Sequence, residues 1–223
     1  MGVAGAVPPD GARKRVINGV VIRLRDDNLD GGIDQGGRDA IAMGKSLVGL
    51  PLSEVHQIGA DHYKLSVSPD GSSVSFERLV GVELGVIKLR NESAFKCMVV
   101  SDGEKAYDLK AGGAAGIPAG DYKLLYGVVG TGSSLITFLP SKTTPTYTIK
   151  AGNINTPKIG MPLRIDFIAS FAGGKATVQP YGVRILGAGD ELYQVQFGGK
   201  MGTPNISLKA GTRTLSSKNM EYG

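Results

Sequence analysis

The stretch HYKLSVSPDGSSVSFE, residues 62–77, decides the fold class of this chain. Apolar and polar side chains alternate over residues 62–67 and again over 73–77. This period of two is typical of β-strands that turn one face toward a core. The intervening Ser68-Pro69-Asp70-Gly71 has the residues of a turn, because proline fixes its own φ and Asp-Gly admits positive φ. The stretch therefore predicts an antiparallel hairpin.

The same style of sequence continues along the whole chain. Short apolar runs alternate with turns that contain glycine or proline, at a spacing of about 8–12 residues, which is typical of β-sandwiches and barrels. Two of the predicted strands cover residues 16–24 and 163–171. No run has the length and periodicity of a substantial amphipathic helix. The sequence therefore predicts an all-β protein.

The domain organisation that we predict has three parts. A flexible N-terminal arm covers residues 1–15, because this segment is rich in Gly, Ala and Pro and lacks periodicity. A β-sandwich domain follows over 16–150 and contains an acidic loop at 26–39. A small sandwich of the Ig-like or transthyretin-like kind covers 151–223. Such a small sandwich buries little surface, so we expect it to depend on its neighbour.

The net charge and the single cysteine indicate which partners and which chemistry the chain could use. The net charge is +5, and residues 140–223 carry ten basic and four acidic residues. These basic residues are spaced singly, which fits solvated strand faces as well as an anionic partner. The one cysteine, Cys97, lies in an apolar run and is predicted to be a buried, inert thiol. No segment has the features of a membrane helix or of a signal peptide.

The densest cluster of oxygen ligands is DDNLDGGID, residues 26–34, with a further carboxylate at Asp39. The pattern matches the first nine positions of an EF-hand loop, but Gly37 occupies the position of the bidentate glutamate and a strand precedes the loop. Two interpretations remain: a structural Ca²⁺ site, or an Asp/Asn/Gly turn that caps its own backbone N–H groups and binds no metal. The metal ligands predicted by the first interpretation are Asp26, Asn28, Asp30, Asp34 and Asp39.

Other motifs offer no catalytic constellation. Gly44-Lys45-Ser46 ends like a P-loop, but Asp39 replaces the required glycine and no helix follows. The two histidines, His56 and His62, are expected at the surface or at the base of the hairpin. The chain has no tryptophan, which weakens carbohydrate binding, and it lacks the basic cluster with interleaved aromatics of a nucleic-acid protein. We therefore predict no catalytic residues and no nucleic-acid partner.

Several short motifs resemble those of uncharacterised exported β-sandwich proteins of environmental bacteria. The chain shares with them an acidic loop of the DxNxDG type at 26–39 and a hairpin at 63–71. A PAGDY corner at 118–122 and the run GAGDELY at 187–193 add to the similarity. The resemblance implies an extracellular or cell-envelope location and no enzymatic activity.

The function predicted from the sequence is that of a non-enzymatic structural or interaction module, stabilised by Ca²⁺ at the acidic loop. A protein partner or self-association is expected, because open sandwiches present strand edges that can accept another strand. Two alternatives stay open. One is a module that binds a glycan or another polyanion through its basic C-terminal part, and the other is a hydrolase with a scattered pair of carboxylates.

Overall fold

The computed structural model describes most of the chain, and every structural statement below concerns that part. The described residues are 12–27, 29–33, 39–44, 49–68, 72–112, 116–131, 134–178, 182–194, 196–197, 200–201 and 205–219. They form an all-β protein, as the strand pattern predicts. The division into two sandwich domains and the Ig-like class of the second stay predictions.

The described residues contain short β-strands along the whole order of the chain and two short helices between them. The helices are η1 (Glu92–Ala94) and α1 (Leu109–Gly112). The strands are β1 (Ala12–Ile17), β2 (Val20–Arg25), β3 (Ala40–Met43), β4 (Leu50–Pro51), β5 (Val55–Ile58), β6 (Asp61–Val67), β7 (Val74–Leu79), β8 (Leu84–Ile87), β9 (Phe95–Ser101), β10 (Ala106–Asp108), β11 (Ile117–Pro118), β12 (Gly120–Thr131), β13 (Ser134–Leu139), β14 (Tyr147–Ile149), β15 (Ile154–Asn155), β16 (Arg164–Asp166), β17 (Ala169–Ala172), β18 (Lys175–Val178), β19 (Arg184–Leu186), β20 (Leu192–Gln194), β21 (Gln196–Phe197), β22 (Lys200–Met201), β23 (Asn205–Ala210) and β24 (Arg213–Asn219).

Two sheets form the N-terminal part of the protein, in the order β1-β2-β3-β4 and β5-β6-β7. The predicted hairpin of 62–77 is confirmed, because β6 pairs with β7 in an antiparallel register that sets Leu65 opposite Phe76. Its predicted turn falls partly on residues 69–71, which lie outside the described residues. The alternating pattern therefore predicted both the strands and their pairing.

The first hairpin corrects two predictions about the N-terminus. Residues 16–24 are not one strand, because Asn18 and Gly19 take positive φ values of 48° and 75° and form a two-residue turn between β1 and β2. Residues 12–15, which we placed in the flexible arm, belong to β1. The Asn18 amide also donates to Asp61 Oδ2 at 2.9 Å and to the Tyr63 hydroxyl at 2.7 Å. The turn is thus tied to the second sheet.

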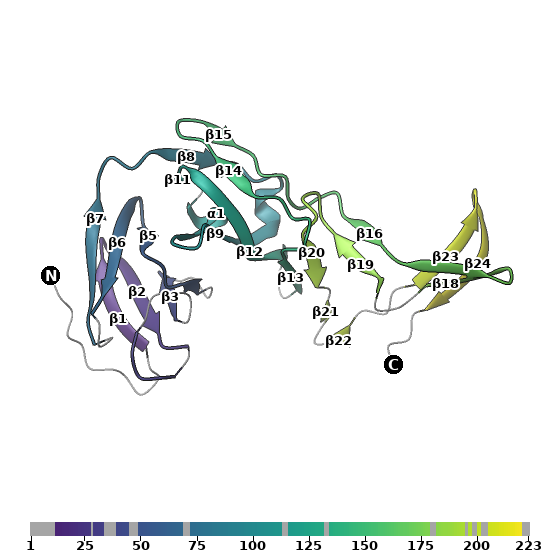
Figure 1. Cartoon of the computed structure of the whole chain (residues 1–223), viewed down its shortest axis with the longest axis horizontal. Coiled ribbons are helices and arrows are strands. Elements are labelled where there is room, and N and C mark those ends of the chain that lie inside the picture. The colour runs from purple at the N-terminus through teal and green to yellow at the C-terminus, as the bar shows by residue number, and fades with distance from the viewer. Residues whose placement is uncertain are drawn as a thin grey trace.

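The central sheet has eight strands, in the order β10-β9-β12-β13-β20-β19-β16, with β14 paired to β12. It includes strands from both sides of Lys150. A three-stranded sheet, β11-β8-β15, lies beside it (Figure 1). Strand β16 is the last strand of the central sheet. The predicted strand over 163–171 is wrong as a single element, since it divides into β16 and β17, which belong to different sheets.

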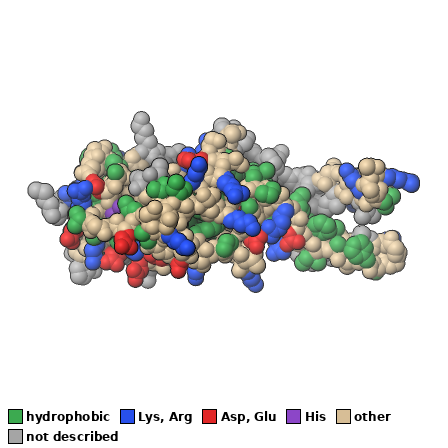
Figure 2. All heavy atoms as spheres, turned by 90° about the horizontal axis from the view of Figure 1, so that it is seen from above, with side chains coloured by type: hydrophobic (Ala, Val, Ile, Leu, Met, Phe, Trp, Pro, Cys, Tyr) green, Lys and Arg blue, Asp and Glu red, His purple; other side chains and the backbone are tan. Residues whose placement is uncertain are grey.

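Beyond the central sheet, the chain forms two-stranded pairs: β17–β18, β21–β22 and β23–β24. In Figure 1, β18 and the β23–β24 hairpin lie at the end of the molecule opposite β1–β7. Figure 2 shows two separate projections at this end, one rich in hydrophobic side chains and the other carrying Lys and Arg. The described side chains of β24 are all exposed. The C-terminal part therefore extends away from the body.

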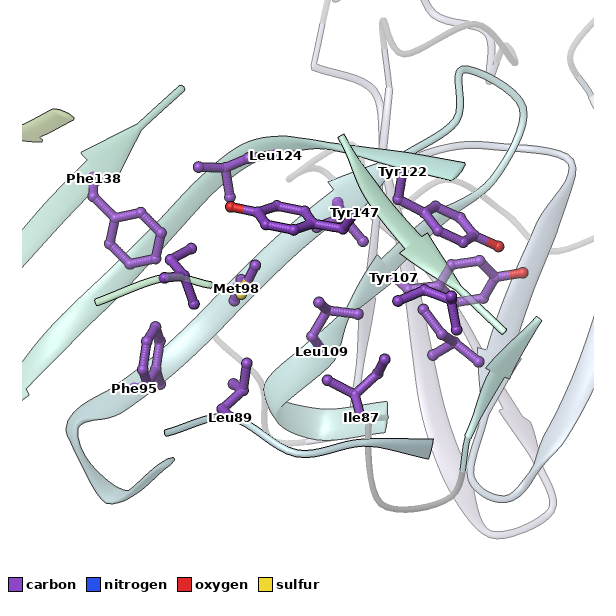
Figure 3. Close-up of a cluster of buried hydrophobic side chains, with 14 of the residues drawn as sticks. Ile87, Leu89, Phe95, Met98, Tyr107, Leu109, Tyr122, Leu124, Phe138 and Tyr147 are labelled. Atoms are coloured by element: carbon purple, nitrogen blue, oxygen red, sulfur yellow. The ribbon is translucent and has the colours of Figure 1, made fainter. Parts of the chain in front are cut away.

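Two hydrophobic cores hold the body together. The N-terminal core lies between the first two sheets and consists of Ile22, Leu24, Ile33, Ile41, Leu52, Ile58, Tyr63, Leu65 and Val74. The central core is larger and includes most of the side chains of Figure 3, such as Phe95, Met98, Tyr122 and Phe138. Here Gly127 is required, because a Cβ at this position would lie 1.9 Å from the Phe138 ring. The Cys97 thiol is buried as predicted, and burial raises its pKa to about 11.

A buried carboxylate attaches the segment before β16 to the turn before β20. Glu191 is fully buried, and its Oε1 accepts hydrogen bonds from Gly160 N at 2.6 Å and from the Tyr193 hydroxyl at 3.2 Å. Its Oε2 accepts from Gly189 N at 2.9 Å. Gly187 and Gly189 must be glycines, since a Cβ would lie 1.7 Å from Glu191 Oε1 in the first case and 2.1 Å from the Lys158 carbonyl oxygen in the second.

The first prediction concerns this carboxylate. Glu191→Ala should destabilise the fold by about 3–5 kcal/mol, because it leaves buried N–H and O–H donors without an acceptor. Urea unfolding measures the change in the free energy of unfolding. Glu83→Ala is the matched control at an exposed position, and it should leave the midpoint unchanged. Equal midpoints for the two variants would contradict the structural role of Glu191.

The second prediction is acid lability from a buried histidine. His56 is fully buried, and burial lowers its pKa from 6.5 to about 4. The unfolded chain therefore takes up a proton as the pH falls below 6.5 while the folded chain does not, so stability present at neutral pH is lost toward pH 4. We expect a loss of about 2 kcal/mol between pH 7 and pH 5.

Urea unfolding at both pH values measures this loss, with His56→Gln as the comparison. Glutamine stays uncharged over this range, so the variant should lose about 2 kcal/mol less than the wild type. His62 adds to the acid sensitivity of both proteins, because burial also lowers its pKa. Parallel pH profiles for wild type and variant would show that His56 is not responsible.

Candidate functional site

The acidic loop connects β2 to β3 at one end of the N-terminal core. The two strands pair so that Arg25 lies opposite Ala40, which brings Asp26 and Asp39 to the two ends of the loop. Asp39 is buried, and its Oδ1 accepts a hydrogen bond from Asp27 N at 3.0 Å. Ile33 is 2% exposed and packs in the N-terminal core. The middle of the loop is thus anchored as well as its ends.

The loop carboxylates are oriented by the loop's own backbone. Asp26 Oδ2 accepts from Gly31 N at 2.8 Å, and Asp30 Oδ1 accepts from Gly32 N at 2.9 Å. Positive φ values at Leu29 (59°) and Gly31 (88°) turn the backbone toward Asp26. Asp26 Oδ1 is buried and has no hydrogen-bond partner within the described structure. An unpartnered buried carboxylate oxygen is costly unless a cation or a donor compensates it.

The predicted calcium ligands are therefore only partly located. Asp26 and Asp39 flank the loop, and Asp30 lies at its exposed tip. Asn28 and Asp34 lie outside the described residues. Within the described ranges, no three His, Cys, Asp or Glu residues are grouped closely enough to hold a metal. A hard cation such as Ca²⁺ prefers carboxylate and carbonyl oxygens, and this loop offers both types.

The two histidines lie on the paired strands β5 and β6. Of the two positions expected for them, the base of the hairpin is correct for His62, which pairs with Leu79 at the start of β6–β7. The surface position is wrong, because His56 and His62 are 0% and 4% exposed. Ser53 N donates to His56 Nε2 at 3.0 Å, and the Ser53 hydroxyl lies 3.4 Å from the same atom. His56 Nδ1 has no partner in the described structure, so no carboxylate orients the ring as a triad requires.

A second candidate site, which sequence reasoning missed, lies around β16 and β17. Six large hydrophobic side chains are exposed to solvent within eleven residues here. Their exposed fractions are Met161 58%, Leu163 41%, Ile165 65%, Phe167 53%, Ile168 61% and Phe171 78%. The alternation was visible in the sequence and predicted a strand. We expected that strand to face the core of a second sandwich, whereas the structure leaves it exposed.

Charged side chains accompany this surface. Arg164 donates to Asp190 Oδ1 at 2.6 Å and to the Gly187 carbonyl at 3.2 Å, and Arg184 pairs with Asp166. Arg164 holds the pKa of Asp190 below its ordinary value. The apolar side chains are thus flanked by two ion pairs: Arg184–Asp166 joins β19 to β16, and Arg164–Asp190 joins β16 to the turn before β20. A contiguous apolar surface of this kind marks an interaction site more often than a free surface.

The geometry carries no sign of a membrane helix, since no helix in the described ranges has the length and apolar character for a crossing. Comparisons of the chain with protein-family models, with curated proteins and with solved structures found no match.

Proposed function

We propose that the protein is a non-enzymatic structural module of the cell envelope or the extracellular space, and that it works by self-association. The observation that carries this proposal is the poor burial of the C-terminal part. Among the described side chains after residue 160, the buried hydrophobic ones are Leu186 and Tyr193, while six others in residues 161–171 are exposed.

The energetics support a partner for this region. Fixing the backbone of each residue costs about 1–2 kcal/mol of conformational entropy, which burial of apolar surface must offset. An isolated two-stranded hairpin is marginally stable in water. The β17–β18 and β23–β24 hairpins each form a separate two-stranded sheet. Contact with another protein surface would supply the burial that these strands lack within one chain.

Charge is unevenly distributed along the chain. Residues 1–80 carry nine basic and ten acidic residues, whereas residues 140–223 carry ten basic and four acidic residues. The N-terminal part is therefore close to neutral, and the net positive charge lies in the C-terminal part. The exposed Lys209, Arg213 and Lys218 on β23–β24 support polyanion binding as a second candidate function.

The calcium part of the proposal rests on Asp26. Its Oδ1 is buried without a hydrogen-bond partner among the described residues, in a loop that also contains Asp30 and Asp39. A cation here would neutralise carboxylates that hold the two ends of the loop together, so its role would be structural. Extracellular modules bind Ca²⁺ with dissociation constants of about 10⁻⁴–10⁻³ M, which suits the proposed location.

The third prediction tests self-association. The full chain should sediment as a dimer or a larger species, and the fraction of this species should rise over a roughly 100-fold range of protein concentration. Analytical ultracentrifugation at moderate salt measures it. A protein that stays monomeric over the whole range would contradict the proposed function, and heparin-dependent assembly alone would favour the polyanion alternative.

The fourth prediction tests calcium. At a Ca²⁺ concentration about ten times the dissociation constant, binding should add about 1.4 kcal/mol, which raises the melting temperature by about 3–6 °C relative to excess chelator. Asp26→Asn should abolish the response, while the control Glu83→Gln, an exposed carboxylate outside the loop, should keep it. Equal melting temperatures of the wild type with calcium and with chelator would remove the metal from the proposal.

A further inference from the structure

Strand β16 is the open edge of the central sheet. It pairs with β19 on one side, where Arg164, Ile165 and Asp166 lie opposite Leu186, Ile185 and Arg184. In the described part of the chain, no strand pairs with its other side. In Figure 1, β16 lies above β19, on the way from the central sheet to the C-terminal hairpins. Its outward backbone groups are therefore available to another strand.

One face of this edge is apolar over several residues. Leu163, Ile165 and Phe167 are spaced two apart on and beside β16, so in extended chain they share a face. Their side chains are between 41% and 65% exposed. Residues on one face at this spacing are normally buried against a neighbour when they are all large and apolar. This apolar stripe of β16 thus has the composition of a strand face that packs against a core, but no core covers it in the described structure.

This face continues the central core. Across the sheet, Phe138 lies opposite Tyr193, Tyr193 opposite Ile185, and Ile185 opposite Ile165. Phe138 and Tyr193 are buried, and Ile185 packs against the central core. The row of apolar side chains therefore leaves the core and ends at Ile165, which is 65% exposed. One more strand would extend the row and cover its end.

The charges on β16 are self-complementary. Its sequence reads Arg164-Ile165-Asp166, so a second β16 laid antiparallel and centred on Ile165 sets each arginine opposite the aspartate of the other copy. The same register sets Leu163 opposite Phe167 and Ile165 opposite itself. Opposite charges and apolar pairs in directly paired positions both stabilise antiparallel strands.

We propose that two copies of the chain join through β16, antiparallel, about a two-fold axis at Ile165, so that the two central sheets become one continuous sheet. This inference rests on the proposed self-association and names its interface. Arg164 and Asp166 keep their partners Asp190 and Arg184 within each copy. A guanidinium has five N–H donors and a carboxylate accepts several hydrogen bonds, so both can also bond across the axis.

Another edge of the protein shows the opposite arrangement. Strand β1, at the edge of the first sheet, contains Arg13-Lys14-Arg15. Two copies of β1 laid edge to edge would set like charges against each other, which is destabilising. Charged edges of one sign protect a sheet from strand addition. The edge at β16 lacks this protection and attracts its own copy, which favours a second chain over an unrelated partner.

A cysteine cross-linking experiment tests the register in the full-length protein. Ile165→Cys should form a disulfide-linked dimer with oxidised glutathione, because directly paired strand residues have Cα atoms about 4.5–5.5 Å apart. Leu163→Cys alone should not, since its two copies would be offset by about 13 Å along the strand. Mixed with Phe167→Cys, however, it should give the heterodimer. The native Cys97 is fully buried and serves as the background in the unmutated chain.

A charge substitution tests the interface by a second route. Ile165→Lys should shift the sedimentation equilibrium toward monomer at least tenfold, while Ile154→Lys, at the exposed first residue of β15, should leave it unchanged. Circular dichroism confirms that each variant is folded. If both variants assemble like the wild type, or if Leu163→Cys cross-links to itself as fast as Ile165→Cys, the β16 interface is wrong although self-association stands. A monomeric wild type would overturn both proposals.

Discussion

The buried carboxylate of Glu191 is the constraint on which the arrangement of the C-terminal half depends. Three donors from Gly160, Gly189 and Tyr193 converge on it inside the protein. The bond to Gly160 fixes the chain shortly before β16, and the turn before β20 fixes β20 against β13. A hydrogen-bonded buried charge tolerates little displacement, because any shift leaves it uncompensated. Glu191 thus sets where the last strands of the central sheet begin.

The hydrophobic burial that stabilises the body is much smaller in the C-terminal part of the chain. The body has two continuous cores. Tyr107 of the central core packs against Tyr122 of the same core at a centroid distance of 5.8 Å, and it contacts His62, the neighbour of Tyr63 in the N-terminal core, at 6.0 Å. The chain after residue 160 contributes little to either core. Strands without burial cannot offset their ordering entropy, so this region depends on whatever covers it. The open edge of β16 lies where the well-packed body meets this poorly buried C-terminal part.

The sequence predicted the fold class and the local hairpins better than the arrangement of sheets. Alternation with a Pro-Asp-Gly turn was sufficient for β6–β7. The turn at Asn18-Gly19 also had a readable signal, because Asn-Gly between alternating runs favours a two-residue hairpin turn, but a single strand was predicted there. The burial of both histidines had no such signal, since tertiary packing alone decides it. Asp26 and Asp39 were predicted together, and the pairing of Arg25 with Ala40 explains why they flank the loop.

The exposed stripe of β16 explains why sequence patterns cannot settle which sheet a strand completes. Leu163, Ile165 and Phe167 have the spacing of a core strand, yet their side chains are exposed. An alternating apolar pattern predicts that one face of a strand is buried. It does not tell whether the same chain or another protein buries that face. The proposed dimer accounts for the charges of the two edges: β1 carries charges of one sign, which disfavour strand addition, whereas Arg164 and Asp166 are placed symmetrically about Ile165. Within one chain, Arg164 and Asp166 pair with Asp190 and Arg184. Their symmetric placement about Ile165 also matches the symmetry of the proposed two-fold dimer.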